Sequence, residues 1–122
     1  MARVVHFEIN ADNPERASKF YSTVFGWNIQ KWDGPEQYWL ASTGDKNEMG
    51  IDGAIMPRQH PQATTINTIG VGSLDDSLKK IMESGGKVVM ERHTIPGVGY
   101  FAYCQDTEGN TFGVMQPDMN AK

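Results

Sequence analysis

The feature that most constrains the fold of this 122-residue chain is an internal repeat with an offset of 60 residues. NPERASKFYSTVFG predicts an amphipathic helix that Asn13 caps and Gly26 ends. SLDDSLKKIMESGG predicts a second helix, with Ser73 as its cap and Gly86 past its end. The two caps and the two terminal glycines are each 60 residues apart. A single repetition of this length indicates a duplicated module and not a solenoid.

Strand-like segments surround both helices in the same order. The chain opens on VVHFEIN, the first helix is followed by WNIQKW, QYWLAST and GIDGAIM, and the second by KVVMER, GYFAYCQ and NTFGVMQ. Each half therefore reads βαβββ, in modules of about 3–58 and 64–117 within one domain, 3–117. The exposed linker PRQHPQATT joins them. We predict an α+β fold with curved mixed sheets around a cleft and helices on the outer face.

The first strand carries polar residues on one side. In VVHFEIN, His6, Glu8 and Asn10 alternate with apolar residues and project together. His6 is open to three interpretations: a ligand contact, a proton-exchanging group, or a satisfied interior histidine. A buried Glu8 needs a partner such as Thr68, Asn10 or His6. It is either a structural hydrogen-bond node or a general base that acts on a carbonyl compound without metal.

Charge and cysteine content exclude several classes of partner. The net charge is −4, with 6 basic and 8 acidic residues in 1–61 and 5 and 7 in 62–122, so neither half is basic. We therefore expect no nucleic acid or membrane partner. The N-terminal MARVVHFEIN turns polar too early for a signal peptide, and the lone Cys104 has no disulfide partner. Both features favour a cytoplasmic location.

Several of these motifs resemble a known superfamily. VVHFEINADNPERASKFYSTVFGW resembles the opening of vicinal oxygen chelate proteins, which include glyoxalase I, the bleomycin-resistance proteins and the extradiol dioxygenases. GGKVV and DTEGNTFGVMQ are similar to the second half of that family's domain. The resemblance covers residues 3–117 and implies the duplicated fold, a small-molecule ligand in the cleft, and a homodimer.

The resemblance also indicates where a metal would be held. In metal-dependent members the first and last strands of each module supply ligands, and the matching positions here are His6, Gly53, Ile66 and Gly113. The 60-residue repeat relates the same positions in pairs. Glycine and isoleucine have no side-chain donor, and one histidine falls far short of the four or more ligands that such ions take. We therefore predict no catalytic metal and no cofactor.

The same positions define the predicted pocket. Three glycines are expected to leave space in it and three apolar residues to line it: Gly53, Gly70 and Gly113, and Ile55, Ile66 and Met115. The predicted ligand-binding residues are His6, Glu8, Asn10, Gly53, Ile55, Ile66, Thr68, Gly113 and Met115. Asn10 stands where glyoxalase I members commonly place an arginine on the glutathione carboxylate, and an amide brings no positive charge there.

Other aromatic and histidine residues have less defined roles. Five aromatic residues either add a flat surface to the pocket or pack in the core: Trp27, Trp32, Trp39, Tyr100 and Tyr103. His60 and His93 lie beside prolines and are interpreted as loop histidines. HTIPGVGYF is either a mobile loop or a turn between the sixth and seventh strands, and we favour the turn.

The sequence thus predicts a protein that binds a small apolar or aromatic molecule in a cleft without a catalytic metal. The alternative is a metal-dependent lactoylglutathione lyase of glyoxalase I type, a lyase or isomerase in which His6 and Glu8 are the catalytic candidates. Whether the chain is an enzyme stays open at this point, because fold resemblance does not define a reaction.

Overall fold

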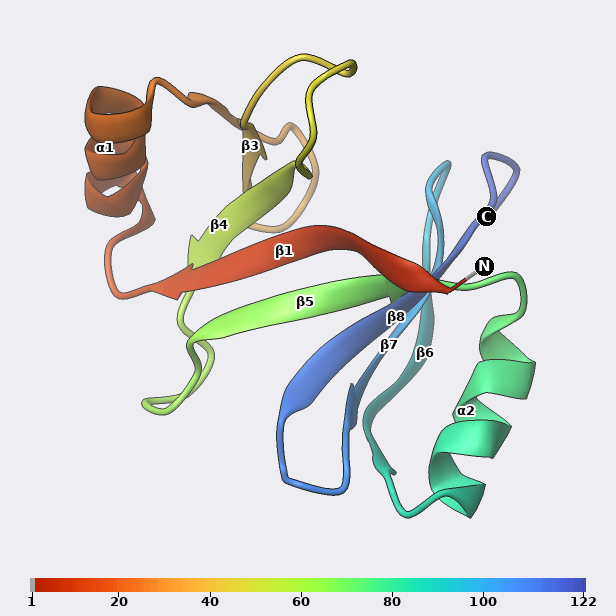
Figure 1. Cartoon of the computed structure of the whole chain (residues 1–122). Coiled ribbons are helices and arrows are strands. Elements are labelled where there is room, and N and C mark those ends of the chain that lie inside the picture. The colour runs from red at the N-terminus through yellow and green to blue at the C-terminus, as the bar shows by residue number, and fades with distance from the viewer. Residues whose placement is uncertain (1) are drawn as a thin grey trace. The chain divides into compact units, whose positions relative to one another are not determined.

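A computed structural model describes residues 2–122, in which two helices and eight strands follow the order βαβββ–βαβββ (Figure 1). The first module contains β1 (Arg3–Ala11), α1 (Pro14–Phe25), β2 (Asn28–Lys31), β3 (Trp39–Ser42) and β4 (Gly53–Pro57). The second contains β5 (Thr65–Gly70), α2 (Leu74–Glu83), β6 (Lys87–Ile95), β7 (Gly99–Gln105) and β8 (Thr111–Pro117). The predicted α+β class and repeated element order are confirmed. Neither helix is long and apolar enough to cross a membrane.

Residues of the chain group into two compact units. One is His6–Ile66, here the N-terminal unit, and the other is Asn67–Lys122 together with residues 2–5, here the C-terminal unit. Most of β1 belongs to the first unit and most of β5 to the second. Each unit has four strands, one helix and a small core of its own, and we describe each by itself.

Local hydrogen bonds explain where the helices begin and end. The Asn13 side chain accepts from the Arg16 N–H at 3.0 Å, and the Ser73 hydroxyl accepts from the Asp76 N–H at 3.2 Å, as the capping patterns predict. Gly26 ends α1 in the left-handed region, with φ of 74°, which glycine adopts without a Cβ clash. α2 ends with Ser84 as its cap, just before the predicted glycine pair.

In the N-terminal unit the strand order is β2-β3-β4-β1, with β1 parallel to β4 and the other pairs antiparallel. One face of this sheet packs on α1. Its buried core is formed by Ala11, Trp39 and Ile55, against which Ile9, Ala17, Tyr21 and Ile29 pack. We call the opposite side of this sheet the helix-free face of the N-terminal unit.

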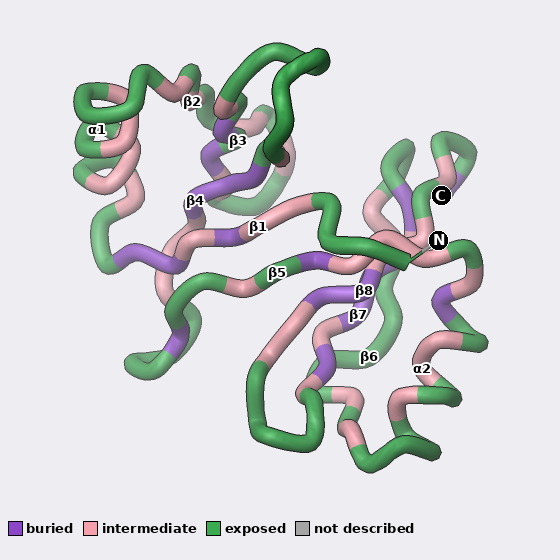
Figure 2. Tube along the Cα trace, viewed as in Figure 1, coloured by how far each residue is buried: buried purple, intermediate pink, exposed green. Residues whose placement is uncertain are grey.

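In the C-terminal unit the order is β5-β8-β7-β6, with β5 parallel to β8. α2 covers a core of four buried residues: Leu74, Ala102, Cys104 and Val114. The buried stretches of β7 and β8 are purple in Figure 2, whereas α2 itself buries only Leu74. Burial raises the pKa of the Cys104 thiol, so this cysteine is a packed apolar residue and an unreactive one.

Two sequence interpretations of loops change here. His93 is not a loop residue, because β6 extends through it to Ile95 and pairs it with Phe101 of β7. The stretch between β6 and β7 is a turn, as favoured, and it is shorter than HTIPGVGYF. His60 is exposed in the connection between β4 and β5, in which Ala63 is buried although the whole linker was predicted to be exposed.

Candidate functional site

Strand register determines which side chains share the helix-free face of the N-terminal unit. Glu8 lies beside Ala54 in the parallel β1–β4 pair, and Ala54 lies opposite Leu40 in the antiparallel β3–β4 pair. Directly paired residues project to the same side of a sheet. With the alternation along each strand, this face carries His6, Glu8 and Asn10 of β1, Leu40 of β3 with Tyr38 just before that strand, and Ala54 and Met56 of β4.

A chain of hydrogen bonds joins three of these side chains. The Tyr38 hydroxyl donates to Glu8 Oε2 at 2.7 Å, and it lies 2.8 Å from His6 Nε2. The Tyr38 and His6 rings stack at an interplanar angle of 15°. Glu8 is only 5% exposed, and its buried carboxylate accepts a hydrogen bond from the tyrosine hydroxyl, as a buried charge requires.

The loop between β2 and β3 positions Tyr38. The Trp32 N–H donates to the Tyr38 carbonyl at 2.7 Å, which closes the loop. The Trp32 ring meets the Tyr38 ring edge to face, with centroids 6.2 Å apart. Trp32 also lies directly over Gly34, where a Cβ would come within 2.2 Å of the indole. The glycine therefore lets Trp32 fold back and hold Tyr38 beside His6.

Electrostatics keep the histidine neutral at neutral pH. Burial lowers the pKa of His6 below its ordinary value of 6.5, against the opposite and smaller effects of the Glu8 and Asp52 carboxylates. Because the net shift is downward, the ring is largely uncharged at pH 7. The site thus presents a neutral imidazole and a carboxylate, linked through one phenolic hydroxyl.

The sequence did not reveal Tyr38. We expected Thr68, Asn10 or His6 as the partner of Glu8, whereas Tyr38 donates to it. The sequence does contain one indication, the alternation of side chains along a strand. Tyr38 stands two residues before Leu40 in QYWLAST, so the two side chains are expected on the same side. Which strand face would meet β1 depends on the sheet order, which the alternation alone does not supply.

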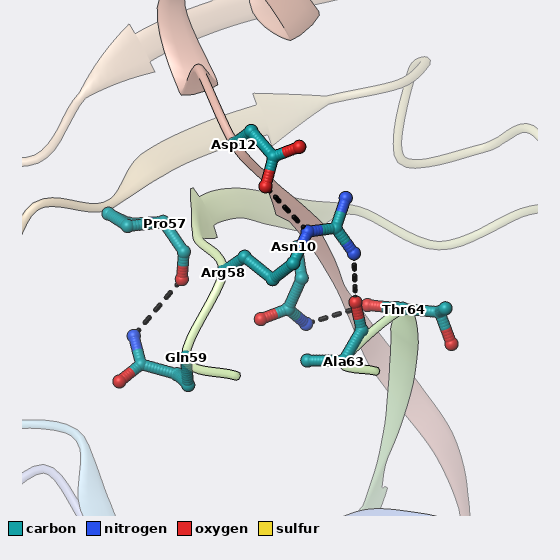
Figure 3. A network of polar contacts seen from close by, with 7 residues as sticks. All are labelled: Asn10, Asp12, Pro57, Arg58, Gln59, Ala63 and Thr64. Atoms are coloured by element: carbon teal, nitrogen blue, oxygen red, sulfur yellow. Dashed lines mark hydrogen bonds and ion pairs between the residues drawn. The ribbon is translucent and has the colours of Figure 1, made fainter. Parts of the chain in front are cut away.

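Asn10 belongs to a separate network that fixes the connection after β4 (Figure 3). Both the backbone N–H and the side-chain amide of Asn10 donate to the Thr64 carbonyl, at 3.1 and 2.6 Å. Arg58 donates to the Asp12 carboxylate at 2.9 Å and also to the Ala63 carbonyl. The Asn10 amide nitrogen is therefore committed to structure, and its Oδ1 is buried without a partner within residues 2–122.

Two predicted pocket residues lie on the other face of their sheet. Gly53 pairs with Phe7, and Ile55 pairs with Ile9. Ile55 packs in the core under α1, so neither residue shares the face of His6. The residue of β4 that corresponds to Gly113 is Ala54, since Ala54 pairs with Glu8 as Gly113 pairs with Thr68. The repeat offset is thus 59 at this strand, one residue less than at the helices.

The glycines do not leave open space. A Cβ at Gly53 would lie 2.5 Å from the Phe7 ring, and one at Gly113 would lie 2.5 Å from the Phe101 ring and 3.0 Å from Thr68 Oγ1. A Cβ at Gly70 would meet Val5 at 3.3 Å. Neighbouring side chains already occupy these volumes, so the predicted roomy pocket at the glycines is wrong within each unit.

The C-terminal unit has a helix-free face of its own. Thr68, Gly113 and Met115 lie on it with Phe101 and Tyr103, whose rings meet edge to face at 4.7 Å. Thr68 Oγ1 is buried there and has no hydrogen-bond partner in the part of the chain described. The ninth predicted ligand residue, Ile66, is half-buried on β5 in the N-terminal unit.

The aromatic residues divide between core and surface roles. Trp39 packs in the core under α1 and Tyr100 in the core under α2. Trp27 stacks on Tyr21 of α1, with centroids 4.8 Å apart. Of the five aromatic candidates, Trp32 is the one that contacts the His6–Tyr38–Glu8 chain within the N-terminal unit.

The residues at the implied metal positions do not fit a divalent cation. With the corrected register these positions are His6, Ala54, Ile66 and Gly113, which together provide one side-chain donor. The Nε2 atom of that donor is already engaged by the Tyr38 hydroxyl. Within residues 2–122 no three His, Cys, Asp or Glu side chains gather closely enough to hold a metal ion.

Two known proteins with glyoxylase names are similar to this chain in sequence. A glyoxylase-like domain-containing protein of Didymella fabae is 30% identical over 112 residues, 88% of each chain. The putative glyoxylase CFP32 of Mycobacterium tuberculosis is 30% identical over 112 residues, but the chain spans only 42% of that protein's length. The two alignments cover 88% and 90% of the present chain.

Solved structures share the fold. A Streptomyces coelicolor methylmalonyl-CoA epimerase variant superposes with a TM-score of 0.73 at 11% identity, over 98% of this chain and 97% of that one. A superfamily member from Vibrio splendidus gives 0.66 at 16% identity, over 97% and 100%. At such identities the likeness concerns fold alone. The family model for the Glyoxalase/Bleomycin resistance protein/Dioxygenase superfamily matches residues 3–114, and the chain belongs to that superfamily.

Proposed function

We propose that the protein binds a small, largely apolar or aromatic molecule on the helix-free face of the N-terminal unit, without a catalytic metal. The observation that carries this proposal is the hydrogen-bonded chain His6–Tyr38–Glu8 beside exposed apolar surface. Leu40 on the same face is 43% exposed, and Met56 is half-buried. A few fixed polar groups beside apolar side chains are typical of small-molecule sites.

The division of roles follows from the geometry. Leu40 and Met56 offer apolar contact to the body of a ligand, while His6 and Tyr38 supply polar groups on the same face. The His6–Tyr38–Glu8 chain is fixed before any ligand arrives, so binding does not have to order it. An aromatic ring in the ligand can also contact Trp32, which lies against Tyr38.

A glyoxalase I activity is not favoured, although relatives carry glyoxylase names. Such an activity needs the metal ligands that the residues at these positions do not supply. We therefore expect no turnover of methylglyoxal plus glutathione above background, with nickel, zinc, iron or manganese added. Stoichiometric metal in protein purified without chelator, lost in His6→Ala, would contradict the metal-free proposal.

The binding site itself can be tested by NMR with 1-methoxynaphthalene as a flat apolar probe. We expect the methyl signals of Leu40 and Met56 to shift on titration, and Leu40→Ser to weaken binding about tenfold, because one buried contact of this size contributes ~1–2 kcal/mol. The control is Val89→Ser, since Val89 is also exposed but lies on β6. Shifts confined to other surfaces, or equal effects of both substitutions, would refute the site.

We further propose a cytoplasmic protein that forms a homodimer. α1 leaves Phe20, Val24 and Phe25 each more than half exposed, which is unusual for large apolar side chains grouped on one helix. Burying them against a second copy removes this surface from water. Sedimentation velocity is expected to give about twice the 13.6 kDa chain mass, and Phe25→Glu is expected to shift the protein towards monomer. A monomer at all concentrations would exclude the dimer.

A further inference from the structure

We propose that His6 presents the bare lone pair of Nδ1 at this site, so that the ligand it selects carries an O–H or N–H donor, as a phenol, an enol or an amide does. The inference rests on the proposed function, because it names the polar group of the molecule bound there. It follows from counting protons along the His6–Tyr38–Glu8 chain.

The Tyr38 hydroxyl has one proton to give. That proton is directed at Glu8 Oε2, 2.7 Å away, because an ionised carboxylate only accepts. At its 2.8 Å contact with His6 Nε2, the hydroxyl oxygen therefore acts as acceptor. Nε2 must then carry the hydrogen, so the buried carboxylate sets the tautomer of the imidazole through the tyrosine.

The second ring nitrogen is consequently without a proton. A neutral imidazole carries one N–H, and the depressed pKa of His6 keeps the ring neutral at pH 7. Within residues 2–122, the buried side-chain atoms that lack a partner are Asn10 Oδ1 and Thr68 Oγ1. Nδ1 is not one of them, and no side chain of this part of the chain bonds to it, so it stays accessible as an acceptor.

The neighbouring polar groups reinforce this preference. Asn10, on the same face, directs its backbone N–H and one N–H of its side-chain amide at the Thr64 carbonyl. The Tyr38 hydroxyl uses its proton on Glu8. Within the His6–Tyr38–Glu8 chain, the group left for a ligand is therefore Nδ1 of His6, which only accepts, and a ligand whose only polar group is a carbonyl or an ether has no donor to give it.

A metal on the same lone pair is the main competitor. Nδ1 would be a single ligand, and the other implied positions supply no donor, so a divalent cation would be bound weakly. A hydrogen-bond donor needs only the one lone pair. Leaving a polar group of the site unpaired commonly changes affinity about tenfold, which is large enough to measure.

The first experiment reads the tautomer directly by 15N NMR of the histidine ring at pH 7.5. We expect protonated Nε2 and unprotonated Nδ1 for His6, and a mixture of tautomers in Tyr38→Phe, which removes the acceptor of the Nε2–H but keeps the ring. Tyr100→Phe is the matched control, since it deletes a tyrosine hydroxyl under α2 and should leave the His6 spectrum unchanged. Protonated Nδ1 in the wild-type protein would overturn the inference.

The second experiment compares two probes that differ in one donor, 1-naphthol and 1-methoxynaphthalene. We expect 1-naphthol to bind about tenfold more tightly, and the difference to disappear in His6→Phe, which keeps an aromatic ring and lacks the lone pair. Equal affinities for the wild-type protein would refute the donor preference and leave the proposed function standing. Failure of both probes to bind would instead refute the proposed function.

Discussion

Gly113→Glu is expected to destabilise the protein strongly and to leave it without metal affinity. The substitution places a carboxylate at the family's eighth-strand ligand position, where the Cβ alone would lie 2.5 Å from the Phe101 ring and 3.0 Å from Thr68 Oγ1. Both neighbours are buried. Overpacking and the burial of an unpaired charge together should reduce the free energy of unfolding by roughly 3 kcal/mol or more.

Urea unfolding of Gly113→Glu beside Gly72→Glu measures this effect. Gly72 is exposed, and a Cβ there meets no atom within 4 Å, so the control adds the same charge without a clash. We expect Gly72→Glu to stay within about 0.5 kcal/mol of the wild-type protein. Wild-type stability of Gly113→Glu, or stoichiometric zinc or nickel binding by it, would show that the β8 position can still accommodate a ligand.

Ile55→Ala is expected to cost about 2–5 kcal/mol of stability, because Ile55 is fully buried under α1 and its truncation leaves a cavity. Met56→Ala, one residue along the same strand, should cost less than about 2 kcal/mol, since Met56 is half-buried on the helix-free face. For ligand binding we expect the opposite order: Met56→Ala should weaken the affinity for the probe, and Ile55→Ala should leave it nearly unchanged.

Thermal or urea unfolding, paired with titration of 1-methoxynaphthalene, checks both halves of this expectation. The register of β1 with β4 places Ile55 on the face that packs on α1 and Met56 on the helix-free face. If Ile55→Ala reduced probe affinity while leaving stability intact, the pocket assignment made from the sequence would be restored. The face assignment given by the register would then be wrong.

The repeat predicted the elements well because their signals are local. Asn13 and Ser73 cap their helices through hydrogen bonds to residues three positions ahead, and Gly26 relieves strain in its own backbone. Such patterns depend on a few neighbouring residues, and both helices and the order of the strands followed from them. The superfamily membership likewise rests on motifs that run through residues 3–114.

The face of β4 was predicted wrongly for a definite reason. The connection from β3 to β4 covers residues 43–52, and that from β7 to β8 only 106–110, so an offset measured at the helices does not carry through. In a strand, an error of one residue moves every side chain to the opposite face. The prediction therefore placed Gly53 and Ile55 on the face of Glu8, where the structure has Ala54 and Met56.

Tyr38 and the space at the glycines depend on contacts between distant parts of the chain. Tyr38 meets Glu8 across 30 residues of sequence, and Phe101 fills the volume beside Gly113 from a neighbouring strand. A composition or periodicity argument contains no information on such pairs. The absence of a catalytic metal, the homodimer, the cytoplasmic location and the identity of the ligand stay predictions that the experiments above address.

Because Cys104 is fully buried, the rate at which a reagent modifies its thiol reports how often the surrounding core opens. The thiol lies in the core of the C-terminal unit and is the only cysteine of the chain. A maleimide or disulfide reagent can modify it only while that core is open, so the labelling rate under native conditions counts opening events. Ile55→Ala creates its cavity in the other unit. A faster labelling rate of Cys104 in this variant would show that destabilising the N-terminal unit also increases opening of the C-terminal unit.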